Sequence, residues 1–524
     1  MKIQNILYSF CVVGLLSTTS CKDFLDEDPR SNITLNTYYK DVSQARENVN
    51  SLYRTGAPVR YGSAPSAYIG PTASVNTFIT GYFSNSYEGQ ELVTLYAREL
   101  TRQQNLRIVS NYMNGIWADS YRAIGIANSA LKYIPGIAMQ DENVRKSLIA
   151  EARFFRAFNY FYLIKTFGDV PLITEPYENL ENMFVPRNSV ADIYALIESD
   201  LKEAVDVLPG TRFTQNGFRI TKYAAAMALA NVYLQQGKFA DAATYAKIVT
   251  ASSHSLTPND NLSMGSAFNK LRTTDDLPEV IYSYEFNATI SNSGWWPSYA
   301  FNASATAISN KYSIYERVFG PTDRFLNVYA ADDLRIQPNQ FFHWNYTLPT
   351  DPTKTWSSTQ AGIWYYYDQE AFVNTGVGTK DWNIYRYAEA LLIAAEAIAK
   401  STGVNAEAAG YLAEIKARAS TTGKTVAQFT TELQALSVDN FVQECWRERL
   451  RELPLEFKMW DDCLRTGMFP VISTTTKGAV TFVPLIGAQN GSGATFKESD
   501  LLWPISMDER QRNPELTQNP GYTP

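Results

Sequence analysis

The chain has 524 residues, of which 45% are hydrophobic and 19% are charged, and its formal net charge at pH 7 is −7. This length allows one large domain or several smaller ones, with ample material for a hydrophobic core. Lys and Arg form no basic run. Because phosphate binding needs clustered positive charge, the composition excludes nucleic acid as an expected partner.

The first residues have the layout of an export signal. Lys2 precedes an apolar run over residues 6–16, small residues occupy 17–20, and Cys21 follows. This order is typical of a signal peptide, and the run is shorter than the roughly 20 residues that a membrane-spanning helix needs. We therefore expect residues 1–20 to be removed and Cys21 to carry a lipid anchor. An ordinary signal peptide that ends near a cysteine is the alternative.

Helical periodicity dominates the rest of the chain. Residues 21–40 are expected to form an acidic tether and N-terminal segment, followed by one domain over 41–524. Apolar residues recur at spacings of three and four over Asp41–Tyr53, Asn105–Tyr133, Val144–Phe167, Ala191–Leu208, Lys222–Gln236, Ala240–Ala251, Tyr387–Lys400, Ala406–Ala419 and Phe441–Thr466. The pattern predicts a mainly α fold whose helical frame lies in 41–55, 100–270 and 381–470.

One predicted pair of helices has the spacing of a tetratricopeptide-like hairpin. Leu229, Ala230, Tyr233 and Ala242 stand at the consensus positions, and Gly237 marks the turn. Small residues at 230 and 242 allow the two helices to approach closely. Such hairpins cannot bury their apolar faces alone, so we expect the other helices to stack beside this one.

Two stretches, 56–99 and 271–380, lose the helical pattern and are rich in aromatic and small polar residues. Long irregular loops are uncommon inside a compact domain and are often functional. We therefore expect the ligand-binding regions there.

Short motifs along the whole chain resemble the SusD/RagB-like family of outer-membrane nutrient-binding lipoproteins. Each is weak alone, and their shared order carries the resemblance. They are Cys21 with Asp23-Phe24-Leu25-Asp26, the segments 151–157 and 167–172, Asp332-Asp333-Leu334-Arg335, the segments 386–392 and 395–397, Pro504-Ile505, and 513–522. One block departs from the family pattern, because Phe457 stands where a small residue is usual and no arginine follows at the expected place.

The resemblance implies a mainly helical fold with four tetratricopeptide-like units and a glycan-type ligand site built on loops. It also implies a partner, a SusC-like TonB-dependent barrel that the lipoprotein covers as a lid. The expected location is the outer membrane, with the protein held by lipid and facing outward.

The ligand site is expected at adjacent aromatic residues on exposed turns. Flat rings stack on the apolar faces of sugars, while amide and hydroxyl neighbours bind the sugar hydroxyls. Trp295 and Trp296, framed by Gly294 and Pro297, form the predicted platform. Tyr299 lies beside them, and Tyr82 or Phe83 reaches in from the earlier loop. The alternative is that these rings are packing residues beneath the loops.

Catalysis finds little support in the sequence. The chain has two histidines, and it contains no His-Glu-x-x-His pattern, thiolate zinc cluster or Gly-x-Ser-x-Gly elbow. Adjacent acids such as Asp275-Asp276 point apart, so they cannot flank a glycosidic bond. We expect no enzyme activity and no cofactor. The many Asp and Asn residues in loops leave bound calcium open, although no EF-hand-like loop supports it.

Two structural expectations concern charged and sulfur-containing residues. Arg386 and Glu389, at i and i+3, predict an ion pair on a helix surface. Cys445 and Cys463 could form a disulfide after export. A chain of this length needs no such link, which favours buried free thiols.

Together the residues and the resemblance predict a lipoprotein that captures an oligosaccharide and passes it to a TonB-dependent importer. A peptide-capturing lid of the same fold is the alternative within the binding class. A cell-surface glycoside hydrolase would need convergent carboxylates in a cleft, and a purely structural helical scaffold would not need loops this rich in aromatic residues.

Overall fold

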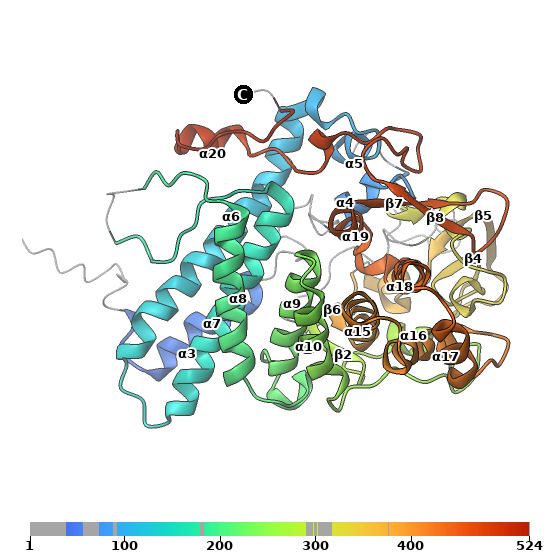
Figure 1. Cartoon of the computed structure of the whole chain (residues 1–524), viewed down its shortest axis with the longest axis horizontal. Helices are drawn as coiled ribbons and strands as arrows, with labels where there is room; N and C mark the ends of the chain where they lie inside the picture. Colours follow the sequence, from blue (N-terminus) through green and yellow to red (C-terminus); the bar gives the residue numbers. More distant parts are fainter. Residues whose placement is uncertain are drawn as a thin grey trace, which may run out of the picture.

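A computed structural model describes residues 38–55, 73–86, 92–178, 183–289, 297, 301, 317–375 and 377–522. Most of these residues are helical (Figure 1), which confirms the predicted mainly α class. The helices and strands are α3 Val42–Thr55, α4 Ala73–Ile79, β1 Phe83–Ser84, α5 Leu92–Arg98, α6 Leu106–Tyr133, α7 Glu142–Phe167, α8 Val190–Val207, α9 Lys222–Gln235, α10 Phe239–Thr250, α11 Ala267–Thr273, β2 Val280–Tyr284, β3 Gly320–Pro321, α14 Asp323–Leu326, β4 Phe342–Thr347, β5 Thr355–Ile363, β6 Trp382–Arg386, α15 Tyr387–Thr402, α16 Ala406–Ala419, α17 Val426–Gln434, α18 Val438–Glu452, α19 Met459–Thr466, β7 Met468–Ile472, β8 Val480–Pro484 and α20 Met507–Arg512. Within these ranges, none of the helices combines the length and the apolar character that crossing a membrane requires.

The larger helices form one continuous row of neighbours (Figure 1). α3 packs on α6, and the row then continues through α7, α8, α9, α10, α15, α16 and α17, each helix against the next. The contact between α10 and α15 joins the N-terminal and C-terminal halves of the chain. α9 lies inside the row, against α8, α10 and α15, and its residues 224–230 are all buried. The predicted stacking of helical hairpins is therefore confirmed.

Local chemistry sets the ends of these helices. The side chains of Asp141, Ser189, Thr221 and Asn405 accept hydrogen bonds from backbone N–H groups in the first turns of α7, α8, α9 and α16. Such caps satisfy donors that the helix itself leaves free. In the predicted α9–α10 hairpin, Gly237 has a φ of +71° at the turn, a conformation that glycine adopts without steric cost.

One predicted helix is wrong in its extent. The segment Phe441–Thr466 divides into α18 and α19, separated by a short 3-10 turn over Pro454–Glu456. Pro454 cannot continue a helix because it has no N–H and its ring clashes with the preceding turn. Phe457, at the position that departs from the family pattern, has a φ of +59°.

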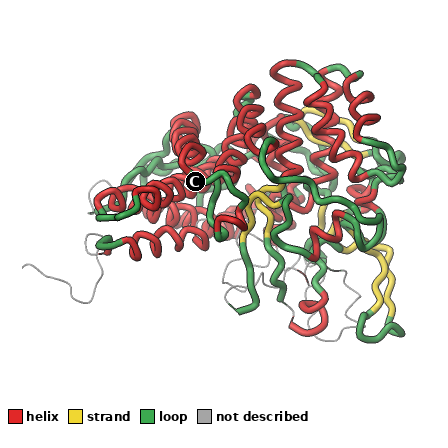
Figure 2. Tube along the Cα trace, turned by 90° about the horizontal axis from the view of Figure 1, so that it is seen from below, coloured by secondary structure: helices red, strands yellow, loops and turns green. Residues whose placement is uncertain are grey.

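The strands form short two-stranded antiparallel sheets (Figure 2), and one of them, β2–β6, lies against the helical row at α9 and α15. The described strands pair as β1–β3, β2–β6, β4–β5 and β7–β8. The β4–β5 hairpin lies within the stretch 271–380, where the helical pattern fades. Short strands therefore give regular structure to part of the stretch 271–380.

The expected Arg386–Glu389 surface pair is wrong. Arg386 is 1% exposed, and its guanidinium contacts Glu279 at 2.6 Å, Glu452 at 3.1 Å and Glu456 at 2.5 Å. Arg418 bonds the same Glu279 and Glu452. Burial by itself raises the pKa of Glu279, but the charges of Arg418 and Arg386 outweigh it and hold that pKa at about 2. The motif arginine therefore ties the segment before β2 to the end of α18.

Cys445 and Cys463 are both buried free thiols. This confirms the preference for unpaired cysteines over a disulfide.

Candidate functional site

Three of the predicted ligand residues, Trp295, Trp296 and Tyr299, lie outside the described residues, as does Cys21. Phe301, just beyond the predicted platform, is 1% exposed. Its ring stacks on His343 with centroids 4.3 Å apart. Its carbonyl oxygen accepts a hydrogen bond of 2.8 Å from the N–H of Arg317. The backbones of Phe301 and Arg317 therefore meet beside an aromatic cluster.

Tyr82 and Phe83 are fully buried core residues. Tyr82 stacks on Phe469 with centroids 5.6 Å apart, and its hydroxyl donates to the carbonyl oxygen of Pro470 at 2.6 Å. Phe83 stacks on Phe319 at 4.6 Å. Neither ring presents a face on which a sugar could stack. The packing alternative describes these two residues, and we do not retain them as ligand contacts.

The described part of the loop region contains a cleft of about 700 Å³, which we call the Arg272 cleft. α11 supplies Arg272, and the outward-facing residues Asn345 and Thr347 come from β4. Asp368 and Lys380 complete its edge. The cleft thus gathers amides, hydroxyls and charges of both signs, the mixture that can fix a polar ligand.

Aromatic rings form the floor of this cleft, but they are covered. Trp364 and Tyr367 stack with centroids 4.4 Å apart and are 7% and 6% exposed. Trp364 donates its indole N–H to Asn269 at 3.0 Å, and the hydroxyls of Tyr346 and Tyr367 lie 2.7 Å apart. These rings therefore support the cleft rather than offer a stacking face.

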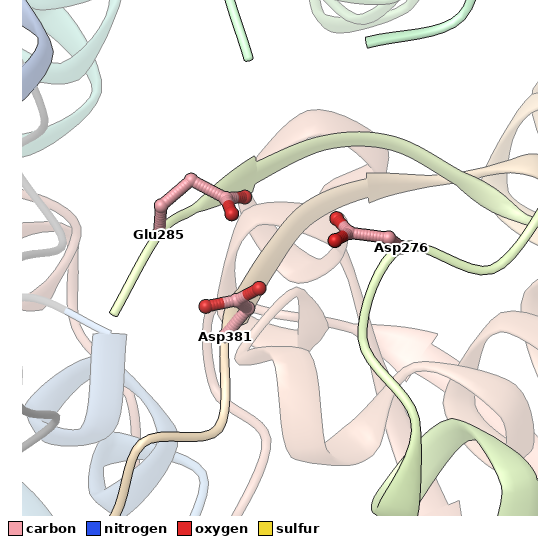
Figure 3. A group of neighbouring side chains, drawn as sticks. All are labelled: Asp276, Glu285 and Asp381. Carbon is pink, nitrogen blue, oxygen red and sulfur yellow. The ribbon is translucent and has the colours of Figure 1, made fainter. Parts of the chain in front are cut away.

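Three carboxylates converge beside β2 and β6: Asp276, Glu285 and Asp381 (Figure 3). One oxygen from each lies within 4.8 Å of the others. The strand register explains the meeting, because Tyr284 pairs with Trp382 and the next residues outward are Glu285 and Asp381. Neither acid stands out in the sequence. Only the pairing of two distant strands reveals them.

Burial and mutual repulsion keep protons on this carboxylate cluster. Burial, followed by the charge of Asp381, raises the pKa of Glu285 to about 8. Burial and the charge of Asp275 raise the pKa of Asp381 to about 7. Asp381 also accepts the N–H of Phe286 at 2.7 Å, whereas the buried Oδ1 of Asp276 accepts no hydrogen bond from the residues described.

The arrangement can share protons or hold a hard cation such as Ca²⁺, which prefers carboxylate oxygens.

Comparison with known proteins places both halves of the chain. A model described as the SusD family matches residues 278–522. A model described as starch-binding associating with outer membrane matches residues 23–234. SusD-like protein P2 of Formosa agariphila is 25% identical over 532 residues, which cover 98% of each chain.

Solved structures agree along nearly the whole length. A SusD superfamily protein from Parabacteroides distasonis superposes with a TM-score of 0.77 and 26% identity, covering 94% of this chain and 100% of that one. Surface glycan-binding protein A from Bacteroides thetaiotaomicron, solved in complex with laminarihexaose, has a TM-score of 0.69 and 16% identity over 92% of this chain and all of its own. The second likeness concerns the fold alone.

Proposed function

Because the chain belongs to the SusD/RagB-like family, we propose that it is a non-enzymatic lipoprotein that binds an oligosaccharide at the cell surface and delivers it to a TonB-dependent outer-membrane transporter. The anchor is the lipid on Cys21, and the protein faces outward. The partner is a SusC-like barrel.

The observation that carries the proposal is the order of the two family matches, over 23–234 and 278–522. Together they include most of the helical row and the irregular stretch after residue 271. The name of the second model contains starch binding and the outer membrane, and a structural neighbour was solved with a glucan oligosaccharide. These names support a carbohydrate ligand and an outer-membrane location.

The primary ligand contacts in this proposal remain Trp295 and Trp296, with Tyr299 beside them. Phe301, two residues after Tyr299 in the sequence, is buried in the aromatic cluster beneath the Arg272 cleft, and this supports a ligand site in the same region.

The experiment is isothermal titration of the mature protein and of the double variant Trp295→Ala/Trp296→Ala with oligosaccharides that the unaltered protein binds. Losing one stacking contact costs about 1–3 kcal/mol, taking base–aromatic stacking as the analogue, or roughly a 5- to 150-fold loss of affinity. We expect the double variant to lose nearly all binding while its thermal midpoint stays close to that of the unaltered protein.

Phe184→Ala is the matched control, since Phe184 is 52% exposed and belongs to another part of the surface; its affinity should not change. Unchanged binding by the double variant would move the site elsewhere. Product analysis after long incubation tests the non-enzymatic claim, and protein-dependent cleavage would overturn it.

A further inference from the structure

We propose that the Arg272 cleft recognises an anionic group on the sugar, so that the bound oligosaccharide belongs to the acidic class that carries uronate carboxylates or sulfate esters. This inference rests on the proposed function and specifies its ligand. The carboxylate and the sulfate share one chemistry, a planar or tetrahedral oxyanion facing a guanidinium.

Arg272 is half-buried and differs from most of the buried arginines in the described chain. Those arginines mostly contact carboxylates, as Arg386 and Arg335 do. Arg272 has no carboxylate oxygen within 4.0 Å in the part of the chain that the structure describes. Its guanidinium therefore faces the cleft without a direct counter-ion.

Two other arginines that share this lack of a carboxylate partner use their donors differently. Arg317 donates to the carbonyl oxygens of Ala361 and Pro321 and to the hydroxyl of Ser84. Arg187 donates to the carbonyl oxygens of Asp169, Phe167 and Thr517 and to the amide oxygen of Asn519. The donors of these two residues are therefore used to hold backbone segments together.

Arg272 leaves part of its donor set unused. Its Nε donates to Asn269 at 3.3 Å and its Nη1 to the carbonyl oxygen of Tyr367 at 3.1 Å. Its Nη2 donates to no acceptor among the described residues. Because the residue lines the cleft, this remaining edge is available to a ligand oxygen.

The rings beneath Arg272 hold it in place. The guanidinium carbon lies 4.9 Å from the centroid of Trp364 and 5.6 Å from that of Tyr367. Burial lowers the pKa of Arg272, although the charges of Tyr367 and Asp368 partly oppose this, and an arginine remains cationic at neutral pH. A stacked guanidinium loses little rotational freedom when it binds an anion, so the cost of ordering is already met.

The acidic residues around the cleft have partners of their own. Asp368 accepts the N–H of Ala371 at 3.0 Å, and Glu370 accepts the side-chain amide of Asn374 at 2.7 Å. Asp275 pairs with Lys380. Of these acids only Asp275 has a cationic partner, while Asp368 and Glu370 bond neutral donors and keep their charge. A ligand anion would therefore bind at the free Nη2 edge of Arg272.

The test measures affinity for paired sets of glycans. The mature protein is screened against acidic polysaccharides (polygalacturonate and alginate for carboxylates, carrageenan and dextran sulfate for sulfates) and against neutral ones (laminarin, starch, xylan and mannan). We expect binding to an acidic member that weakens as NaCl rises. Which acidic set binds distinguishes the carboxylate from the sulfate.

Variants then assign the effect to Arg272. Hydrogen bonds to charged groups predict that Arg272→Gln lowers affinity for the acidic oligosaccharide about 10- to 150-fold. Arg272→Lys keeps the charge and loses the fork geometry, so its affinity should lie between those of the unaltered protein and Arg272→Gln. Arg122→Gln is the control, since the Arg122 side chain is 60% exposed and pairs with Asp119 on the same helix. The thermal midpoint of each variant checks its folding.

Each outcome is decisive. Binding of neutral glycans alone, or an equal loss of neutral and acidic binding in Arg272→Gln with an unchanged midpoint, overturns the acidic class and leaves the proposed function standing. Binding of no member of either set overturns the proposed function as well. If Arg272→Gln unfolds, Arg272→Lys and the salt dependence of the unaltered protein still decide between the classes.

Discussion

The guanidinium of Arg386 joins three acids from separate segments: Glu279 before β2, Glu452 at the end of α18 and Glu456 in the turn that follows. All four side chains are largely or fully buried. Charges in such a position are stable only while each keeps its partner, because an unpaired buried charge is costly. The residue thus acts as a link between the two chain segments rather than as a ligand contact.

We predict that Arg386→Met lowers the free energy of unfolding by about 3–5 kcal/mol, the usual cost of breaking a buried ion pair from one side. Methionine fills similar space but leaves Glu456 without its ion-pair partner among the described residues, and Glu279 and Glu452 without one of their cations. Thermal and urea unfolding measure the effect. Arg122→Gln, at an exposed pair, should stay within about 0.5 kcal/mol of the unaltered protein. A loss below about 1 kcal/mol in Arg386→Met would contradict the role of the network.

The carboxylate cluster predicts a dependence of stability on pH. The pKa values of Glu285 and Asp381 are raised to about 8 and about 7, whereas those in the unfolded chain are about 4. Between these limits the folded state binds more protons than the unfolded state, so the free energy of unfolding falls as pH rises from about 4 to about 8. Asp381→Asn should flatten this slope, with its largest gain in thermal midpoint near pH 8.

Unfolding curves at pH 5 and pH 8, recorded in EDTA, measure this slope. Asparagine can still accept the N–H of Phe286, so the local hydrogen bond is kept. Equal slopes for Asp381→Asn and the unaltered protein would contradict the prediction. Repeating the curves in excess CaCl₂ shows whether a cation keeps the carboxylates ionised, in which case the slope of the unaltered protein disappears.

At the scale of elements, the end of α7 explains why two motifs far apart in the sequence belong together. The carbonyl oxygen of Phe167 accepts hydrogen bonds from Arg187 at 3.1 Å and from Asn519 at 2.9 Å. Asn519 also donates to the carbonyl oxygen of Trp503 at 2.7 Å. The C-terminal motif therefore closes over the connection between α7 and α8.

Gly168 makes this connection possible. It ends α7 with φ +71° and ψ −131°, and a Cβ there would lie 2.8 Å from Cδ1 of Leu502. We predict that Gly168→Ala lowers stability by about 1–3 kcal/mol, the usual cost of a strained backbone position. The thermal midpoint measures it.

Gly115→Ala is the control for that change. Gly115 lies within α6, and a Cβ there would meet nothing within 4 Å, so alanine should stabilise the helix by roughly 0.5–1 kcal/mol. Similar effects of both substitutions would show that the left-handed conformation of Gly168 does not matter.

At the scale of the whole molecule, the helical row forms a frame to which the short sheets and the long connections are attached (Figure 2). A frame of stacked hairpins is stabilised by contacts between neighbours. It can therefore carry long connections without relying on them for stability, as the proposed binding function requires.

We predict that Cys21→Ala releases the protein from the membrane fraction, because the lipid is the proposed link to the outer membrane. Fractionation followed by immunoblotting measures this, and retention at the level of the unaltered protein would exclude a lipid anchor at Cys21. A mild-detergent pull-down with the unaltered protein should recover a SusC-like barrel, and its repeated absence would count against the proposed partner.

The sequence by itself determined the helical frame and the family. Spacings of three and four residues and turn residues such as Gly237 act within one or two turns, so they can be read locally. Local patterns gave a wrong prediction at Phe441–Thr466, because the apolar spacing continues through Pro454 although the helix does not. They also failed for Tyr82 and Phe83, since neighbouring polar residues suggested exposure while Phe469 and Phe319 cover both rings.

Only the tertiary structure decided where the isolated charges go. The sequence predicted a surface pair for Arg386, whereas in the structure the end of α18 lies beside it and buries it. Glu285 and Asp381 meet because β2 pairs with β6. The proposed role of Arg272 depends on Trp364 and Tyr367, whose rings lie beneath its guanidinium. Electrostatic roles depend on which distant residues share a low-dielectric space, and no local pattern in the chain encodes that.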